Sequence, residues 1–88
     1  MLHKNIRVTG RVQGVGFRYS ARQVAREIGV KGFVRNQPDG SVYIEAEGEP
    51  DQVERFLAWC REGPSRAVIS HVSVYDSDVR GFTEFLIS

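Results

Sequence analysis

A glycine-containing loop followed by an arginine is the part of this sequence best suited to chemistry. Gly14 and Gly16 interrupt an alternating apolar pattern, and Arg18 follows where a helical pattern begins. Glycines let successive backbone N–H groups turn to one side, and a helix N-terminus adds partial positive charge, so such a loop can bind an anion. The planar guanidinium of Arg18 can donate to two phosphate oxygens. The spacing alone fits either a phosphate site or a plain strand-to-helix turn with a solvated arginine.

Two better-known glycine motifs do not fit this loop. A P-loop ends in Gly-Lys-Ser/Thr, whereas Gly16 is followed by Phe17 and Arg18. A dinucleotide fingerprint that starts at Gly14 needs a third small residue at position 19, which is Tyr19. The sequence therefore disfavours nucleotide binding.

Hydrophobic periodicity indicates the elements that must position the loop. Alternation with period two predicts strands, apolar residues at i, i+3, i+4 and i+7 predict helices, and glycine or proline marks their ends. The expected strands are residues 6–12, 31–36, 42–47, 68–75 and 82–87, and the expected helices are residues 18–28 and 50–62. This order, β-α-β-β-α-β with a short fifth strand, predicts an α+β ferredoxin-like sandwich with an antiparallel sheet and two helices on one face.

Two longer motifs resemble those of the acylphosphatase family. Gly-x-Val-Gln-Gly-Val-x-Phe-Arg matches residues 10–18 without a departure, and Gly-x-Val-x-Asn-x-x-Asp-Gly-x-Val matches residues 32–42. The resemblance extends to Gly48, to residues 63–65 and to the closing residues 85–87, so it covers essentially the whole chain as one domain, 1–88. It favours the phosphate site over the plain turn.

The resemblance implies hydrolysis of the carboxyl-phosphate bond of acyl phosphates to a carboxylate and inorganic phosphate. Arg18 matches the family's phosphate-binding arginine, and Asn36 matches its water-positioning asparagine. The residues that match the loop whose amides cradle the phosphoryl oxygens are Gln13, Gly14, Val15, Gly16 and Phe17. No side chain serves as an obvious base; in the mechanism proposed for the family, the substrate's own phosphate oxygen takes the water proton. By itself, Asn36 would also suit the entrance to the Pro-Asp-Gly turn.

The other reactive side chains have structural interpretations. Cys60 falls on the apolar face of the second expected helix, which indicates a core residue. His3 is terminal and His71 lies in an expected strand, and neither has a second ligand at metal spacing. We therefore expect no metal site and no cofactor.

Two alternative functions use the same fold. Ferredoxin-like sheets also bind RNA by stacking bases on aromatic residues of the central strands. Here the first strand offers no aromatic residue, and Tyr43, Glu45 and Glu47 predict an exposed face whose acids would repel phosphate. Acylphosphatase-like domains also open large carbamoyltransferases that mature hydrogenases and cleave carbamoyl phosphate. A chain that ends at Ser88 favours the stand-alone enzyme.

Length and composition limit the remaining classes. The 88 residues suit one domain, and 41% apolar with 26% charged residues is typical of a soluble globular protein. The net charge of +1 creates no strong field toward nucleic acid or an anionic membrane. No apolar stretch approaches the roughly 20 residues that span a bilayer.

Cysteine content and size give the remaining expectations. A single cysteine cannot form an internal disulfide, which favours a reducing cytoplasm. Small size and near-neutral charge favour a monomer. The expected partners are a small acyl phosphate and, as competing anions, inorganic phosphate or sulfate, with no nucleic acid and no membrane.

Overall fold

The computed structural model describes all residues, 1–88, as five strands and two helices. The strands are β1 (Leu2–Arg11), β2 (Lys31–Asn36), β3 (Val42–Gly48), β4 (Val68–Ser77) and β5 (Phe85–Ile87), and the helices are α1 (Phe17–Ile28) and α2 (Pro50–Glu62).

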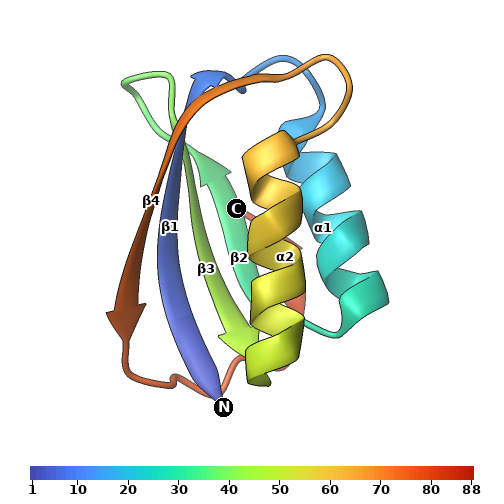
Figure 1. Ribbon diagram of the computed structural model, residues 1–88, viewed down its shortest axis with the longest axis vertical. Coiled ribbons are helices and arrows are strands. Elements are labelled where there is room, and N and C mark those ends of the chain that lie inside the picture. The colour runs from blue at the N-terminus through green and yellow to red at the C-terminus, as the bar shows by residue number, and fades with distance from the viewer.

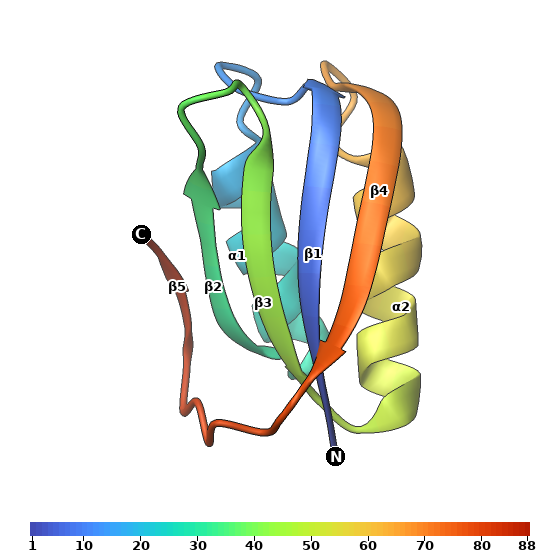
Figure 2. The ribbon, with the colours of Figure 1, turned by 90° about the vertical axis from the view of Figure 1, so that its left-hand side faces the viewer.

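The strands form one sheet in the order β4-β1-β3-β2-β5, and both helices cover the same face of it (Figures 1 and 2). β1 lies between β3 and β4 and is antiparallel to both, and β2 and β3 form the expected hairpin. The ferredoxin-like fold is therefore confirmed. The fifth strand adds one feature to it: β5 runs parallel to β2, with Val34 opposite Ile87, so the sheet is mixed.

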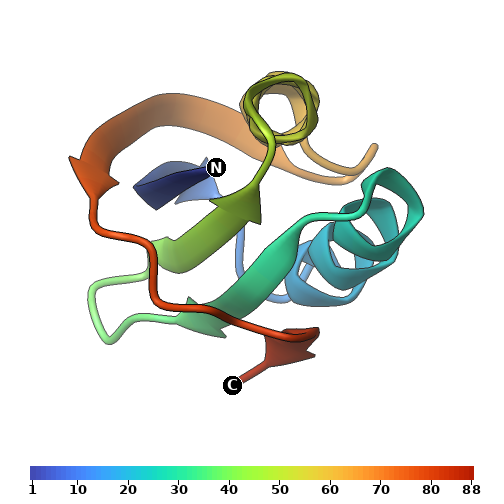
Figure 3. The ribbon, with the colours of Figure 1, turned by 90° about the horizontal axis from the view of Figure 1, so that it is seen from below.

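The chain between the last two strands differs from the expectation. The strand expected at residues 82–87 begins only at Phe85. Before it, residues 78–84 cross from the β4 edge of the sheet to the β5 edge, on the side away from the helices (Figure 3). The Glu47 carboxylate accepts hydrogen bonds from the backbone N–H groups of residues 80–82, at 2.6 to 3.0 Å. These donors are thus engaged by a side chain and are not available to a strand ladder.

The prediction of an exposed acidic face is wrong for Glu45 and Glu47, which are only 7% and 2% exposed. The two ring nitrogens of His3 lie 2.8 Å from Glu45 Oε1 and 2.7 Å from Glu47 Oε2. The Phe82 ring stacks on the His3 ring at 5.7 Å between centroids. Covered in this way, the two acids are no obstacle to RNA on this face, although β1 still offers no Phe, Tyr or Trp.

Hydrogen bonds set the ionisation of this buried cluster. Burial raises the pKa of Glu47, but the hydrogen bonds from the Arg80 N–H, from His3 and from the next two N–H groups outweigh burial and hold the pKa below its usual value. Burial and the hydrogen bond that Tyr43 donates to Glu45 raise the pKa of Tyr43 to about 12. The cluster therefore fastens the crossing segment to the sheet with an ionised Glu47.

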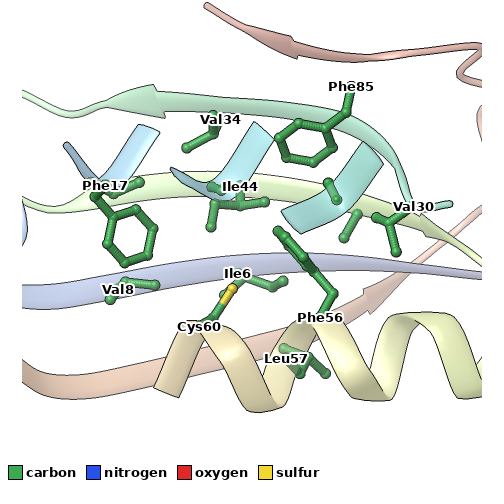
Figure 4. Packing of buried hydrophobic residues seen from close by; sticks show 14 of the residues in the cluster. Ile6, Val8, Phe17, Val30, Val34, Ile44, Phe56, Leu57, Cys60 and Phe85 are labelled. Carbon is green, nitrogen blue, oxygen red and sulfur yellow. The ribbon is translucent and has the colours of Figure 1, made fainter. Parts of the chain in front are cut away.

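The hydrophobic core lies between the sheet and the two helices (Figure 4). It joins 16 buried residues, among them Cys60, as expected. Phe17, the first residue of α1, is 1% exposed and packs against Trp59 at 5.2 Å between ring centroids. Burying such a side chain contributes about 1.5–3 kcal/mol, so it fixes the start of α1 and with it the position of Arg18.

Candidate active site

The loop between β1 and α1 is shaped by two glycines in left-handed conformation. Gly14 has φ 73° and Gly16 has φ 80°, and Gly16 is also the N-cap residue of α1. A Cβ atom at either glycine would meet no atom within 4 Å, so the conformation, not crowding, requires glycine here. Alternating left-handed and ordinary residues is the backbone pattern of an anion-binding nest.

The backbone donors of this loop have no acceptor within the chain. No N–H from Gln13 to Tyr19 donates to another protein atom, and the first bond of the helix runs from Ser20 N–H to Gly16 O at 3.0 Å. No side chain caps α1, and its first turn holds no acidic residue. The unpaired N–H groups and the helix dipole together therefore leave positive potential at this point.

Arg18 and Asn36 line the same surface hollow, which has a volume of about 200 Å³. The residues that line it are Val12, Gly14, Gly16, Phe17, Arg18, Tyr19, Asn36 and Ile87. Arg18 is half-buried and forms no salt bridge, so its guanidinium remains available to an anion. Two buried side-chain oxygens lack a hydrogen-bond partner, Oδ1 of Asn5 and Oδ1 of Asn36, and of these two residues only Asn36 lines the hollow.

The side chain of Gln13 joins the loop to the turn that follows Asn36. Its Nε2 donates to the carbonyl oxygens of Gln37 at 2.8 Å and Ser41 at 2.9 Å. We call this pair of hydrogen bonds the Gln13 clip. Because the side-chain amide is engaged in the clip, Gln13 can offer a phosphate only its backbone N–H. Val15 does not line the hollow and packs against the core.

An ionised aspartate shapes the β2–β3 turn. Asp39 accepts hydrogen bonds from the Ser41 hydroxyl at 2.6 Å and the Ser41 N–H at 2.9 Å, and it pairs with Arg7. These contacts, led by the Ser41 hydroxyl, lower the pKa of Asp39 to about 2. The turn that carries Asn36 is therefore held by contacts on both of its sides, from Gln13 and from Asp39.

Sequence reasoning did not single out two residues of the hollow, Tyr19 and Ile87. Tyr19 is 59% exposed at the rim. Ile87 reaches the hollow because β5 pairs with β2 beside Asn36. Only the resemblance at residues 85–87 could have pointed to Ile87, and no signal marked Tyr19.

The other reactive residues lie apart from the hollow. Burial raises the pKa of the Cys60 thiol, and His71 is exposed on β4. No group of three His, Cys, Asp or Glu side chains is arranged to hold a metal ion. Neither helix has the length and apolar character that crossing a membrane would require.

A ferredoxin-like sandwich with unpaired loop amides beside an unpaired arginine defines a small phosphate-binding α/β domain. Comparison with known proteins makes the class specific. Residues 4–87 match the acylphosphatase family. An acylphosphatase from Thermotoga maritima is 51% identical over 82 residues, which is 93% of this chain and 91% of that protein.

Solved structures agree with the sequence comparison. The crystal structure of an acylphosphatase from Bacillus subtilis superposes with a TM-score of 0.97 at 37% identity and covers 100% of this chain and 99% of that one. Full-length HypF in its phosphate- and nucleotide-bound form contains a similar region, with 33% identity and a TM-score of 0.89 over 12% of its length. The chain belongs to the acylphosphatase family, and it is an enzyme that hydrolyses acyl phosphates.

Proposed function

We propose that the N–H groups of residues 13–17 and the Arg18 guanidinium hold the phosphoryl group of the acyl phosphate, while Asn36 orients the attacking water. The unbroken run of unpaired N–H groups in the β1–α1 loop is the observation that carries this assignment. Such donors bind tetrahedral oxyanions, and an unpaired arginine adds a full positive charge. The phosphate-bound form of HypF, which contains a similar region, is consistent with it.

The proposed reaction is a single in-line displacement. The oxygen of water attacks phosphorus, the bond between phosphorus and the acyl oxygen breaks, and the carboxylate leaves with the bonding electrons. The proton of the water passes to an oxygen of the phosphoryl group, so the products are a carboxylate and inorganic phosphate. The Asn36 amide can both donate and accept, and its unpaired Oδ1 is suited to accept from that water.

So few side chains suffice because the substrate is already activated. An acyl phosphate is a mixed anhydride whose carboxylate leaving group is a weak base, so no strong general acid is needed. Phosphoryl transfer mostly requires positioning and stabilisation of charge. A well-placed donor in a preorganised site contributes about 3–4 kcal/mol to that stabilisation.

Hydrolysis of benzoyl phosphate with inorganic phosphate as inhibitor tests this assignment. Phosphate and sulfate present the same tetrahedral oxygens as the substrate, so both should inhibit competitively. Carbamoyl phosphate in a parallel assay tests the alternative use of the same site. If phosphate at high concentration fails to raise the apparent KM for benzoyl phosphate, the proposed phosphate site is wrong.

We also propose that the enzyme acts as a monomer in the cytoplasm. Its one thiol, Cys60, is fully buried in the core, where a reducing compartment is not required for protection but is compatible with a free cysteine. Light scattering of the purified protein at assay concentration would detect a dimer and so contradict the monomer.

A further inference from the structure

Three arginines follow one another along one side of α1, starting at the hollow. Arg18, Arg22 and Arg26 are spaced four residues apart, which places them on neighbouring positions of a helix surface. None of the three forms a salt bridge. Glu27 is the one acidic residue of the helix, so the helix side chains carry a net positive charge.

Arg22 leans toward the hollow. Its guanidinium carbon lies 5.4 Å from the centre of the Tyr19 ring, in cation–π contact. Helical side chains point back toward the N-terminus, which brings a residue over the turn that precedes it. Four residues of helix rise correspond to about 6 Å, so Arg22 follows Arg18 at a distance that a short acyl group can span.

Tyr19 joins the hollow to a second, shallower depression. That depression has a volume of about 340 Å³ and is lined by Tyr19, Arg22, Gln23, Arg26 and Glu27. Tyr19 lines both, so the two surfaces are continuous at its ring. A group that leaves the hollow over Tyr19 therefore meets Arg22 next.

The lining of the hollow restricts where the acyl group can lie. With the phosphoryl group and water held as proposed, four lining residues remain: Val12, Phe17, Tyr19 and Ile87. Val12 and Phe17 are each 1% exposed, so they form the floor. The accessible sides are Tyr19 and Ile87, and no acidic residue lines the hollow.

We infer that the enzyme prefers acyl phosphates whose acyl group carries a second negative charge, with Arg22 as the receiving residue and Arg26 behind it. The inference rests on the proposed function, because it assumes that the phosphoryl group binds beside Arg18. The chemical class is a dicarboxylic or phosphorylated acyl group that extends along α1. The steps that make such substrates are therefore phosphorylations of one carboxylate of a doubly anionic acid.

The test compares 4-carboxybenzoyl phosphate with 4-methylbenzoyl phosphate. The two have nearly the same shape, and the rigid ring keeps the distal carboxylate from attacking the acyl carbon. The quantity read is the ratio of their kcat/KM values, so differences in intrinsic reactivity cancel between variants. We expect Arg22→Gln to lower this ratio about threefold, the size of an exposed ion pair, and Arg22→Glu to lower it about tenfold. Arg22→Lys should retain most of the preference.

Arg55→Gln is the matched control, because Arg55 is exposed on α2 and its loss changes the net charge equally. It should leave the ratio unchanged. High salt should bring the wild-type ratio close to that of Arg22→Gln. The inference is overturned if both Arg22→Gln and Arg22→Glu keep the wild-type ratio, or if Arg55→Gln lowers it as much. Failure of the wild type to hydrolyse either substrate would instead overturn the proposed function.

Discussion

The two helices of this chain begin in opposite ways. At the start of α2, Glu49 and Gln52 form a reciprocal capping box, with the Glu49 N–H donating to Gln52 Oε1 at 2.9 Å. Pro50, which has no N–H, occupies the first turn, and Asp51 adds a negative charge there. At the start of α1, Gly16 supplies no cap and no acid follows it. One helix satisfies its terminal donors with its own side chains, and the other leaves them free.

This difference separates a structural helix start from a functional one. The first N–H groups of any helix lack intrahelical acceptors, and satisfying them stabilises the fold. A helix that leaves them open forgoes that stabilisation, and its dipole then favours an external anion. In this chain the open start also has Arg18, an extra positive charge that would be unfavourable at an ordinary helix N-terminus. The two starts should therefore respond differently to mutation, one in activity and the other in stability.

Removal of Arg18 is expected to have the largest effect. Arg18→Ala should lower kcat/KM for benzoyl phosphate by roughly a thousandfold or more, since it removes a charged, bidentate donor from the phosphoryl group. Arg18→Lys should recover little, because an ammonium group cannot make the paired contact. Circular dichroism should show an unchanged fold. Near-wild-type turnover of a folded Arg18→Ala enzyme would remove the functional side of the comparison.

Asn36 should affect turnover and not anion binding. Asn36→Ala should lower kcat roughly a hundredfold, because the amide is proposed to contact the nucleophile and not the phosphoryl group. The inhibition constant of inorganic phosphate should change less than about twofold. Asn36 precedes the β2–β3 turn, so folding is checked first. A variant that loses phosphate affinity as severely as Arg18→Ala would contradict this division of roles.

A cap introduced at α1 should make its start resemble that of α2. Asp and Asn both tolerate the left-handed conformation of Gly16 better than other residues, and they have the same shape. Gly16→Asp places a carboxylate at the helix start, where it repels phosphate and competes for the N–H groups. We expect the phosphate inhibition constant to rise about tenfold more for Gly16→Asp than for Gly16→Asn. Equal constants in the two variants would mean that charge at this helix start does not matter.

Loss of the cap on α2 should change stability alone. Gln52→Ala removes the capping box and also the hydrogen bond from Gln52 Nε2 to Ile28 O. The free energy of unfolding in urea should fall by about 1 kcal/mol. Turnover of the folded enzyme should not change, since α2 contributes nothing to the hollow. A loss of kcat with unchanged stability would invert the comparison.

The smallest effects are expected away from both helix starts. Treatment with a chelator should leave turnover within about twofold, because the proposed reaction uses only amides, Arg18 and Asn36. The substitution His71→Gln should be equally neutral, since His71 is exposed on β4. Loss of activity on chelation that a divalent ion restores would contradict the proposed mechanism.

What the sequence could predict follows from how local each feature is. The strands, the helices and the glycine loop are encoded by neighbouring residues, so periodicity alone indicated them. Resemblance was needed to separate the phosphate site from a plain turn and to pick out Asn36. The structure then brought Arg18 and Asn36 to one hollow.

The features that sequence reasoning missed depend on distant partners. Glu45 and Glu47 alternate as an exposed strand face does, and only the fold shows that His3 and the segment 78–84 cover them. The Gln13 clip joins residues that are adjacent only because β1 and β3 pair. Local pattern cannot register contacts of this kind.

The strand order has a further consequence, for the rate at which the protein folds. Of the four hydrogen-bonded strand pairs, only β2 with β3 joins strands that are consecutive in the chain. Every other pair must close a long loop before its hydrogen bonds and core contacts offset the lost entropy, and chains with such non-local pairing fold in milliseconds to seconds, not microseconds. The loop with Arg18 follows β1, and Asn36 ends β2, so pairing of both with β3 must precede assembly of the hollow. Enzyme activity regained during refolding therefore reports on the slow, non-local closure of the sheet and not on the early formation of its helices.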